Sequence, residues 1–142
     1  MSLKTWKAEF YPTTAKQSAR GSALNAARHS LQKWTGLTKA SMKRHGVRIN
    51  GYREVQEAGA SEYRDDSFVV DDESCSLCEK FFGDPRYDDD CCIKCPLYKT
   101  LGGKRCDGDK QPYLVWADTQ DPAPMIAALR KTVKRLEKEA KR

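Results

Sequence analysis

The stretch CSLCEKFFGDPRYDDDCCIKCPL, from Cys75 to Leu97, contains five of the six cysteines in this chain of 142 residues. Cys75 and Cys78 form one Cys-x-x-Cys pair, and Cys92 and Cys95 form a second pair after thirteen residues. Each pair can supply two thiolates from one tight turn, and the chain between them returns the second pair to the same point, as tetrahedral zinc requires. The spacing therefore predicts a module that holds one structural Zn²⁺ ion.

Six cysteines exceed the four ligands that one zinc ion needs, so the ligand set stays open. The preferred ligands are Cys75, Cys78, Cys92 and Cys95. Cys106 is the substitute ligand, and the set Cys75, Cys78, Cys95 and Cys106 is also geometrically reasonable. Cys91 is the expected spare.

Disulfide bonds and a catalytic thiol are the other interpretations of such a cysteine cluster. The first residues lack the apolar core of a signal peptide, and no stretch approaches the length of a membrane span. We therefore expect a cytoplasmic protein, in a reducing environment where clustered cysteines more often bind metal. A catalytic thiol would need a base, and the only histidines, His29 and His45, lie outside the cysteine stretch.

Charge is distributed unevenly along the chain. Residues 1–50 carry ten Lys or Arg against one Glu, whereas residues 51–95 carry five against thirteen acids. Residues 130–142 are basic again, with seven Lys or Arg against two Glu. Basic ends of this kind can bind nucleic acid or an acidic protein surface, or close onto the acidic middle.

The apolar spacing and the cap residues predict a mainly α protein with a small β hairpin, an α+β fold. In this fold a zinc-knuckle or treble-clef-like cysteine module packs with flanking helices. The expected division is a basic helical region at 1–58, an acidic linker with a short strand at 59–74, the zinc module at 75–118 and a basic amphipathic helix at 119–142, all within one compact domain.

Individual elements follow from the same signals. Helices are expected over Ser18–Trp34, over Thr38–His45, from Pro96 to residue 101, and from about Pro124 to the terminus. A hairpin over Val47–Val55 should turn at Asn50-Gly51, and SFVVDD at 67–72 should form a strand. The apolar positions of the last helix predict packing on the protein's own core or a homodimer seam, so the chain is a monomer or a homodimer.

Several of these stretches resemble one group of proteins. CSLCEKFF, DDDCCIKCPL, GGKRCD, DPAPMIAALRKTV and SLQKWTGLTKASMKRHGV resemble small uncharacterised proteins encoded by tailed bacteriophages, over about two thirds of the chain. Cys91, beside the expected Cys92, departs from the pattern of that group. The resemblance implies a phage origin and expression inside a bacterial host cell, without an established activity.

Three functions are consistent with these features. The first is a non-enzymatic, zinc-stabilised protein that binds a host or phage macromolecule, in particular a host protein in take-over of the cell or inhibition of its defences. The second is sequence-nonspecific DNA or RNA binding, with basic candidates at Arg28, Lys33, Lys43, Arg44, Arg48, Arg130 and Lys134. The third is a zinc-stabilised nuclease in which His45 acts with Asp88–Asp90.

We expect no enzyme, because no His lies between Cys75 and Cys106. We also expect no membrane partner.

Overall fold

The fold is mainly helical with a small antiparallel sheet, which confirms the expected α+β class. The computed structural model describes residues 2–61, 66–82 and 92–142. The helices are α1 (Leu3–Phe10), α2 (Ala15–Ala19), α3 (Ala23–Thr35), α4 (Lys39–His45), α5 (Ser76–Phe81), α6 (Pro96–Thr100), α7 (Pro112–Thr119) and α8 (Ala123–Ala140). The strands are β1 (Val47–Ile49), β2 (Glu54–Glu57) and β3 (Ser67–Val69).

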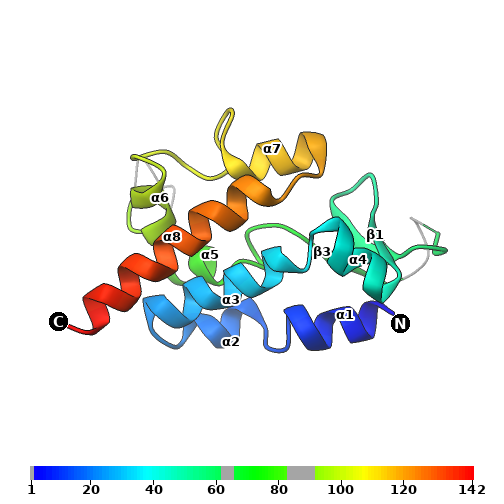
Figure 1. Ribbon diagram of the computed structural model, residues 1–142, viewed down its shortest axis with the longest axis horizontal. Coiled ribbons are helices and arrows are strands. Elements are labelled where there is room, and N and C mark those ends of the chain that lie inside the picture. The colour runs from blue at the N-terminus through cyan, green and yellow to red at the C-terminus, as the bar shows by residue number, and fades with distance from the viewer. Residues whose placement is uncertain (1, 62–65, 83–91) are drawn as a thin grey trace.

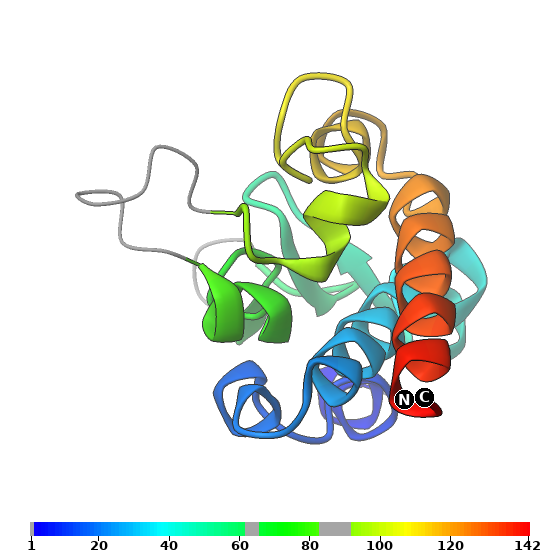
Figure 2. The same ribbon diagram turned by 90° about the vertical axis from the view of Figure 1, so that its left-hand side faces the viewer.

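Helix α3 is the centre of the packing, because it contacts α1, α2, α5 and α8. Figure 1 shows α3 and α8 running side by side along the molecule, with α1 and α2 below them and α7 above. The sheet and α4 lie toward the end that holds the N-terminus, and α6 lies toward the end that holds the C-terminus. The view in Figure 2, turned by 90°, shows α6 and α3 on the same side of α8.

Cap residues explain where several helices begin and end. Thr38 caps α4 by accepting a hydrogen bond from the backbone N–H of Ser41, and Gly46 ends α4 with a φ of 65°. The expected helix over Ser18–Trp34 is instead split into α2 and α3, because the hydroxyl of Ser22 accepts from the N–H of Asn25 and starts a new helix. Helices α6 and α8 begin near the expected prolines.

The expected hairpin is present, but its turn differs. Val47 pairs with Glu57 and Ile49 pairs with Val55, so residues 50–53 form a four-residue loop in place of a two-residue turn at Asn50-Gly51. Arg53 takes the left-handed conformation, with a φ of 61°. The Asn50 side chain accepts hydrogen bonds from the N–H groups of residues 52 and 54, which fixes the wider loop. Strand β3 pairs with β2 and completes the order β1-β2-β3.

One hydrophobic cluster joins the sheet, the N-terminal helices and the cysteine-rich segment. It contains Trp6, Trp34 and Trp116 together with Leu77 and Leu97, which flank cysteines. The inward face of α8 belongs to the same cluster, through Met125, Ile126, Leu129 and Val133. That face packs on α3, α6 and α7 of the same chain, which favours the core role of this face over a homodimer seam.

Close contact between α1 and the end of α3 gives a first test. The indole N–H of Trp6 donates to the carbonyl of Gly36 at 2.8 Å, and a Cβ atom at Gly36 would lie 2.5 Å from Cγ of Phe10. Because the crowded atoms include the Cβ and Cγ of Phe10, the ring cannot rotate out of the way. Gly36→Ala should therefore lower the free energy of unfolding by about 1–3 kcal/mol in urea denaturation.

Gly59→Ala is the matched control, since a Cβ atom at that position meets nothing within 4 Å. We expect a change within about 0.5 kcal/mol. Equal stability of the two variants would contradict the described packing of α1 on α3.

Candidate metal centre

Five cysteine side chains line one small cavity. Its volume is about 20 Å³, close to the space that a single water molecule or ion occupies. The cavity is lined by Cys75, Cys78, Cys92, Cys95 and Cys106, with Leu77, Phe82, Leu97 and Tyr98 completing the wall. The structure thus brings the four preferred ligands and the substitute ligand together, while Cys91 lies outside the described residues.

Short helices and turns bring these cysteines to the cavity. Cys75 is the N-cap residue of α5, and Cys78 lies in the first turn of that helix. Cys95 is the N-cap residue of α6, and its backbone N–H donates to the carbonyl of Cys92 at 2.9 Å, which closes the second Cys-x-x-Cys turn. Cys106 follows α6, and its carbonyl accepts from the N–H of Tyr113 at 2.8 Å, which ties it to the start of α7.

None of the five described cysteines forms a disulfide, and their surroundings shift their pKa values in different directions. A hydrogen bond from Cys78 holds the pKa of Cys75 well below its usual range, and Lys33 and Ser30 act in the same direction. Donation of that hydrogen bond raises the pKa of Cys78. Burial raises the pKa of Cys95 to about 11 and also raises that of Cys106. The surroundings therefore favour the thiolate form of Cys75 and the neutral form of Cys78, Cys95 and Cys106.

The sulfurs share a wall but are not gathered into ligand positions. Among residues 2–61, 66–82 and 92–142, no group of three or more His, Cys, Asp or Glu side chains is placed so that it could hold a metal ion as it stands. The Cys75–Cys78 hydrogen bond accounts for part of this arrangement, because it pairs two sulfurs with each other. Coordination would replace that shared proton and draw the sulfurs inward.

Helix α3 places a lysine and a serine beside the cysteines. Lys33 is 1% exposed, and its ammonium group donates to the carbonyl of Ser74 at 3.0 Å. The hydroxyl of Ser30 lies 3.6 Å from the sulfur of Cys75. Burial lowers the pKa of Lys33, whereas the negative charge of Cys75 opposes this change. A positive charge that lies inside the protein next to thiolates lowers the cost of burying them.

Lys33 thus lies where sequence reasoning did not place it. As a nucleic-acid contact it would need exposure, but it is buried among the core side chains. A signal existed in the sequence, because Ala26, Ser30 and Lys33 follow each other at steps of four and three on the buried face of α3. The basic charge of residues 1–50 favoured a surface interpretation of Lys33, so its buried position was missed.

The other basic candidates are distributed over α3, α4, β1 and α8. Arg28 pairs with Glu137 at 3.7 Å, and Arg44 donates two hydrogen bonds of 2.8 Å to Glu9. Arg48 donates to the backbone carbonyls of residues 58 and 60. Lys43, Arg130 and Lys134 are exposed. Arg130 and Lys134 therefore remain as exposed neighbours on one helix.

Both histidines are engaged in contacts between elements. Nε2 of His45 contacts Glu9 at 2.5 Å and Nδ1 contacts the hydroxyl of Thr5 at 2.9 Å, so the ring joins α4 to α1. Nε2 of His29 donates to the carbonyl of Thr13 at 2.7 Å, and Nδ1 accepts from the hydroxyl of Ser76. The expected partner acids of His45, Asp88–Asp90, lie outside the described residues.

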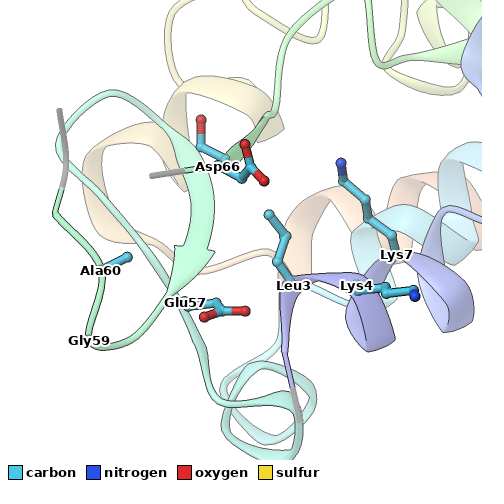
Figure 3. Close-up of a pocket in the computed structure, with 8 residues that line it drawn as sticks. Leu3, Lys4, Lys7, Glu57, Gly59, Ala60 and Asp66 are labelled. Carbon is cyan, nitrogen blue, oxygen red and sulfur yellow. The ribbon is translucent and has the colours of Figure 1, made fainter. Parts of the chain in front are cut away.

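A second hollow, of about 940 Å³, lies between α1 and the strands β2 and β3. Figure 3 shows Leu3 in its middle, with Glu57 and Asp66 on the strand side and Lys4 and Lys7 on α1. Lys4 points away from both carboxylates in this view. The acids and cations do not surround a common point, so this hollow offers no evident set of metal ligands.

No family model, no curated protein and no solved structure matches the chain. The phage resemblance of the sequence motifs therefore stays a prediction. No helix in the described part of the chain is both long and apolar enough to cross a membrane.

The contact between α1 and α4 gives a prediction about pH. Hydrogen bonds from Arg44 first, and from His45 second, hold the pKa of Glu9 below its usual value of 4.5. A carboxylate with a lowered pKa in the folded state stabilises the fold above about pH 4.5, and this contribution is lost as the pH falls further. Glu9→Gln should therefore unfold at less urea than wild type at about pH 7, and the difference should shrink only below about pH 4.5.

Glu57→Gln is the control, because Glu57 is exposed and takes part in no ion pair within the described residues. Its urea midpoint should follow that of the wild type throughout. A Glu9→Gln variant as stable as wild type at neutral pH would contradict the contact.

Proposed function

We propose that this protein is a non-enzymatic, zinc-stabilised binding protein, in which four cysteine thiolates hold one Zn²⁺ ion and the flanking helices bind a macromolecule. The observation that carries this proposal is the convergence of five free cysteines on one cavity of about 20 Å³. Thiolates are the ligands that structural zinc sites use most, at a Zn–S distance of about 2.3 Å. The phage resemblance suggests a macromolecule of the bacterial host or of the phage, in the cytoplasm.

Zinc suits the charge of this cavity. Four thiolates and one Zn²⁺ carry a net charge of about −2, and the buried ammonium of Lys33 offsets part of it. The backbone N–H groups of Leu97 and Tyr98 also lower the pKa of Cys95 against the effect of burial. Besides the sulfurs themselves, the surroundings of the cavity therefore include groups that stabilise thiolates.

A structural role for the metal agrees with the surroundings of the site. The cysteines join α5, α6 and the start of α7, which are short elements. An ion that binds only the folded arrangement adds its binding free energy, on the order of 10 kcal/mol, to folding. Within the described residues both histidines contact groups in other elements. A structural ion at the cysteines would leave the binding role to the flanking helices.

Metal content tests the proposal directly. Protein purified under reducing conditions should contain about one zinc per chain by elemental analysis. Removal of the metal by a chelator should lower the thermal midpoint and the helical circular dichroism, because α5 and α6 lose their common anchor. Cys75→Ser should lose the metal, since Ser cannot supply the thiolate that Lys33 and Ser30 stabilise.

Cys91→Ser is the matched control, because it changes the cysteine expected to be spare. It should keep one zinc per chain. Wild-type protein without metal, or with disulfides among the residues of the cavity, would contradict the proposal.

Lys33→Met tests the buried counter-charge. Met has a similar length and no charge, so the fold can keep its packing while the zinc site loses its internal cation. We expect the zinc affinity, measured by competition with a chromogenic chelator, to fall by about tenfold or more. Lys94→Met is the control, because Lys94 lies between Cys92 and Cys95 in sequence but is exposed, where water screens its charge. Equal losses in the two variants would show that Lys33 has no special role.

A further inference from the structure

The outer face of α8 carries an uninterrupted row of cations. Arg130, Lys131, Lys134 and Lys138 are all exposed, and their spacing of three and four residues places them on one side of the helix. These four residues form the basic ridge. The opposite side of the helix is buried, with Ile126, Leu129 and Val133 facing the core.

Acidic side chains of α8 do not neutralise the basic ridge. Glu137 pairs with Arg28 of α3 at 3.7 Å, and Glu139 pairs with Arg135 at 3.8 Å. Both acids are thus paired with arginines outside the basic ridge. No ion pair within the described part of the chain includes a residue of the ridge. Like charges one turn apart destabilise a helix, and a bound polyanion would remove that repulsion.

The helix that carries the ridge is held rigidly. Its inner face packs on α3, α6 and α7, and Figure 2 shows α6 and α3 on its inner side. Arg135 donates to the carbonyl of Pro96 at 2.7 Å and to the hydroxyl of Thr100 at 3.0 Å, which fixes α8 to the helix that follows Cys95. The four cations are therefore presented in a fixed row of about 12 Å.

The chemistry of the ridge favours a phosphate backbone over a protein surface. Protein interfaces have an apolar or aromatic centre and are depleted in lysine, whereas three of the four ridge residues are lysines. The other exposed residues of this face, Ala123 and Ala127, provide little apolar surface. Lysine and arginine rows contact nucleic-acid phosphates, which lie about 3.4 Å apart along the axis of each DNA strand.

We propose that the basic ridge binds the phosphate backbone of nucleic acid without sequence preference, an inference that rests on the proposed binding function and names its partner. A fixed row of about 12 Å can span three to four phosphates of one strand. Contacts of these side chains with phosphates position the nucleic acid and do not read its bases. Neutralisation of four phosphates predicts that log K falls with log salt concentration at a slope of about −3.6 for duplex DNA and −2.8 for single strands.

Fluorescence anisotropy over a salt series tests this inference on the zinc-loaded, full-length chain. The probes are a labelled DNA duplex and labelled single-stranded DNA and RNA of mixed sequence. In the variant Arg130→Gln, Lys134→Gln, Lys138→Gln, the duplex slope should weaken by about 2.7, and affinity at low salt should fall by about 100-fold or more. Circular dichroism and zinc content should not change, because these side chains are exposed.

The control removes the same charge elsewhere, as Lys4→Gln, Lys16→Gln, Lys39→Gln, which alters three exposed lysines on α1, α2 and α4. Its slope should stay close to that of the wild type. Equal effects of the two triple variants would overturn the inference, and so would absence of binding to all three probes. Displacement of the DNA by polyglutamate at matched charge would indicate an acidic protein partner, which also overturns it. Each of these results leaves the zinc site standing, whereas protein without zinc contradicts the proposed function itself.

Discussion

The structure depends on a place where several sulfurs and one ammonium group are buried together. Cys75 reaches this place from α5, Cys95 from α6, and Lys33 from the central helix α3. Buried charges are costly unless they compensate one another. Burial accordingly raises the pKa of Cys106, whereas Cys78, Lys33 and Ser30 lower the pKa of Cys75. A divalent cation with four sulfur ligands would complete this compensation, and this is the basis on which we propose zinc.

This cavity and the surface of α8 are linked through short contacts. Arg135 on the inner side of α8 donates to the carbonyl of Pro96, the residue that follows Cys95. The hydroxyl oxygens of Thr132 on α8 and Thr100 on α6 lie 2.6 Å apart. Residues that carry the proposed nucleic-acid contact are therefore set on a helix that is anchored to the cysteine segment. In this account the metal organises the platform, and the outer cations do the binding.

Sequence patterns predicted the parts of the fold that local signals determine. The Thr38 cap, the Gly46 stop and the proline starts of α6 and α8 are local, and the structure confirms them. Helix α1 was not predicted, although local signals exist: Ser2 and Thr5 form a capping box, and the buried residues Leu3, Trp6 and Phe10 follow at steps of three and four. Contacts of Trp6 with Gly36 and Phe68 then hold this helix against α3 and β3. The split between α2 and α3 depends on a serine cap inside an otherwise helical pattern.

The sequence predicted which cysteines lie together around the cavity, but it did not predict the other groups that surround them. That these cysteines hold a metal stays a prediction. Cys-x-x-Cys spacing is a short-range signal, so the convergence of the described cysteines could be expected from sequence. The role of Lys33 could not be expected in the same way, because it depends on a long-range contact. Helix α3 packs on α5, and Lys33 donates to Ser74, which lies 41 residues later in the sequence. The basic composition of residues 1–50 suggested a nucleic-acid-binding surface that includes Lys33. The packing of α3 instead places Lys33 in the interior.

X-ray absorption spectroscopy at the zinc edge, on protein purified under reducing conditions, tests the central claim most directly. The account predicts stoichiometric zinc with four sulfur neighbours at about 2.3 Å and no nitrogen or oxygen in the first coordination shell. A spectrum with two or fewer sulfur neighbours, or with a shell of nitrogen and oxygen, would contradict it.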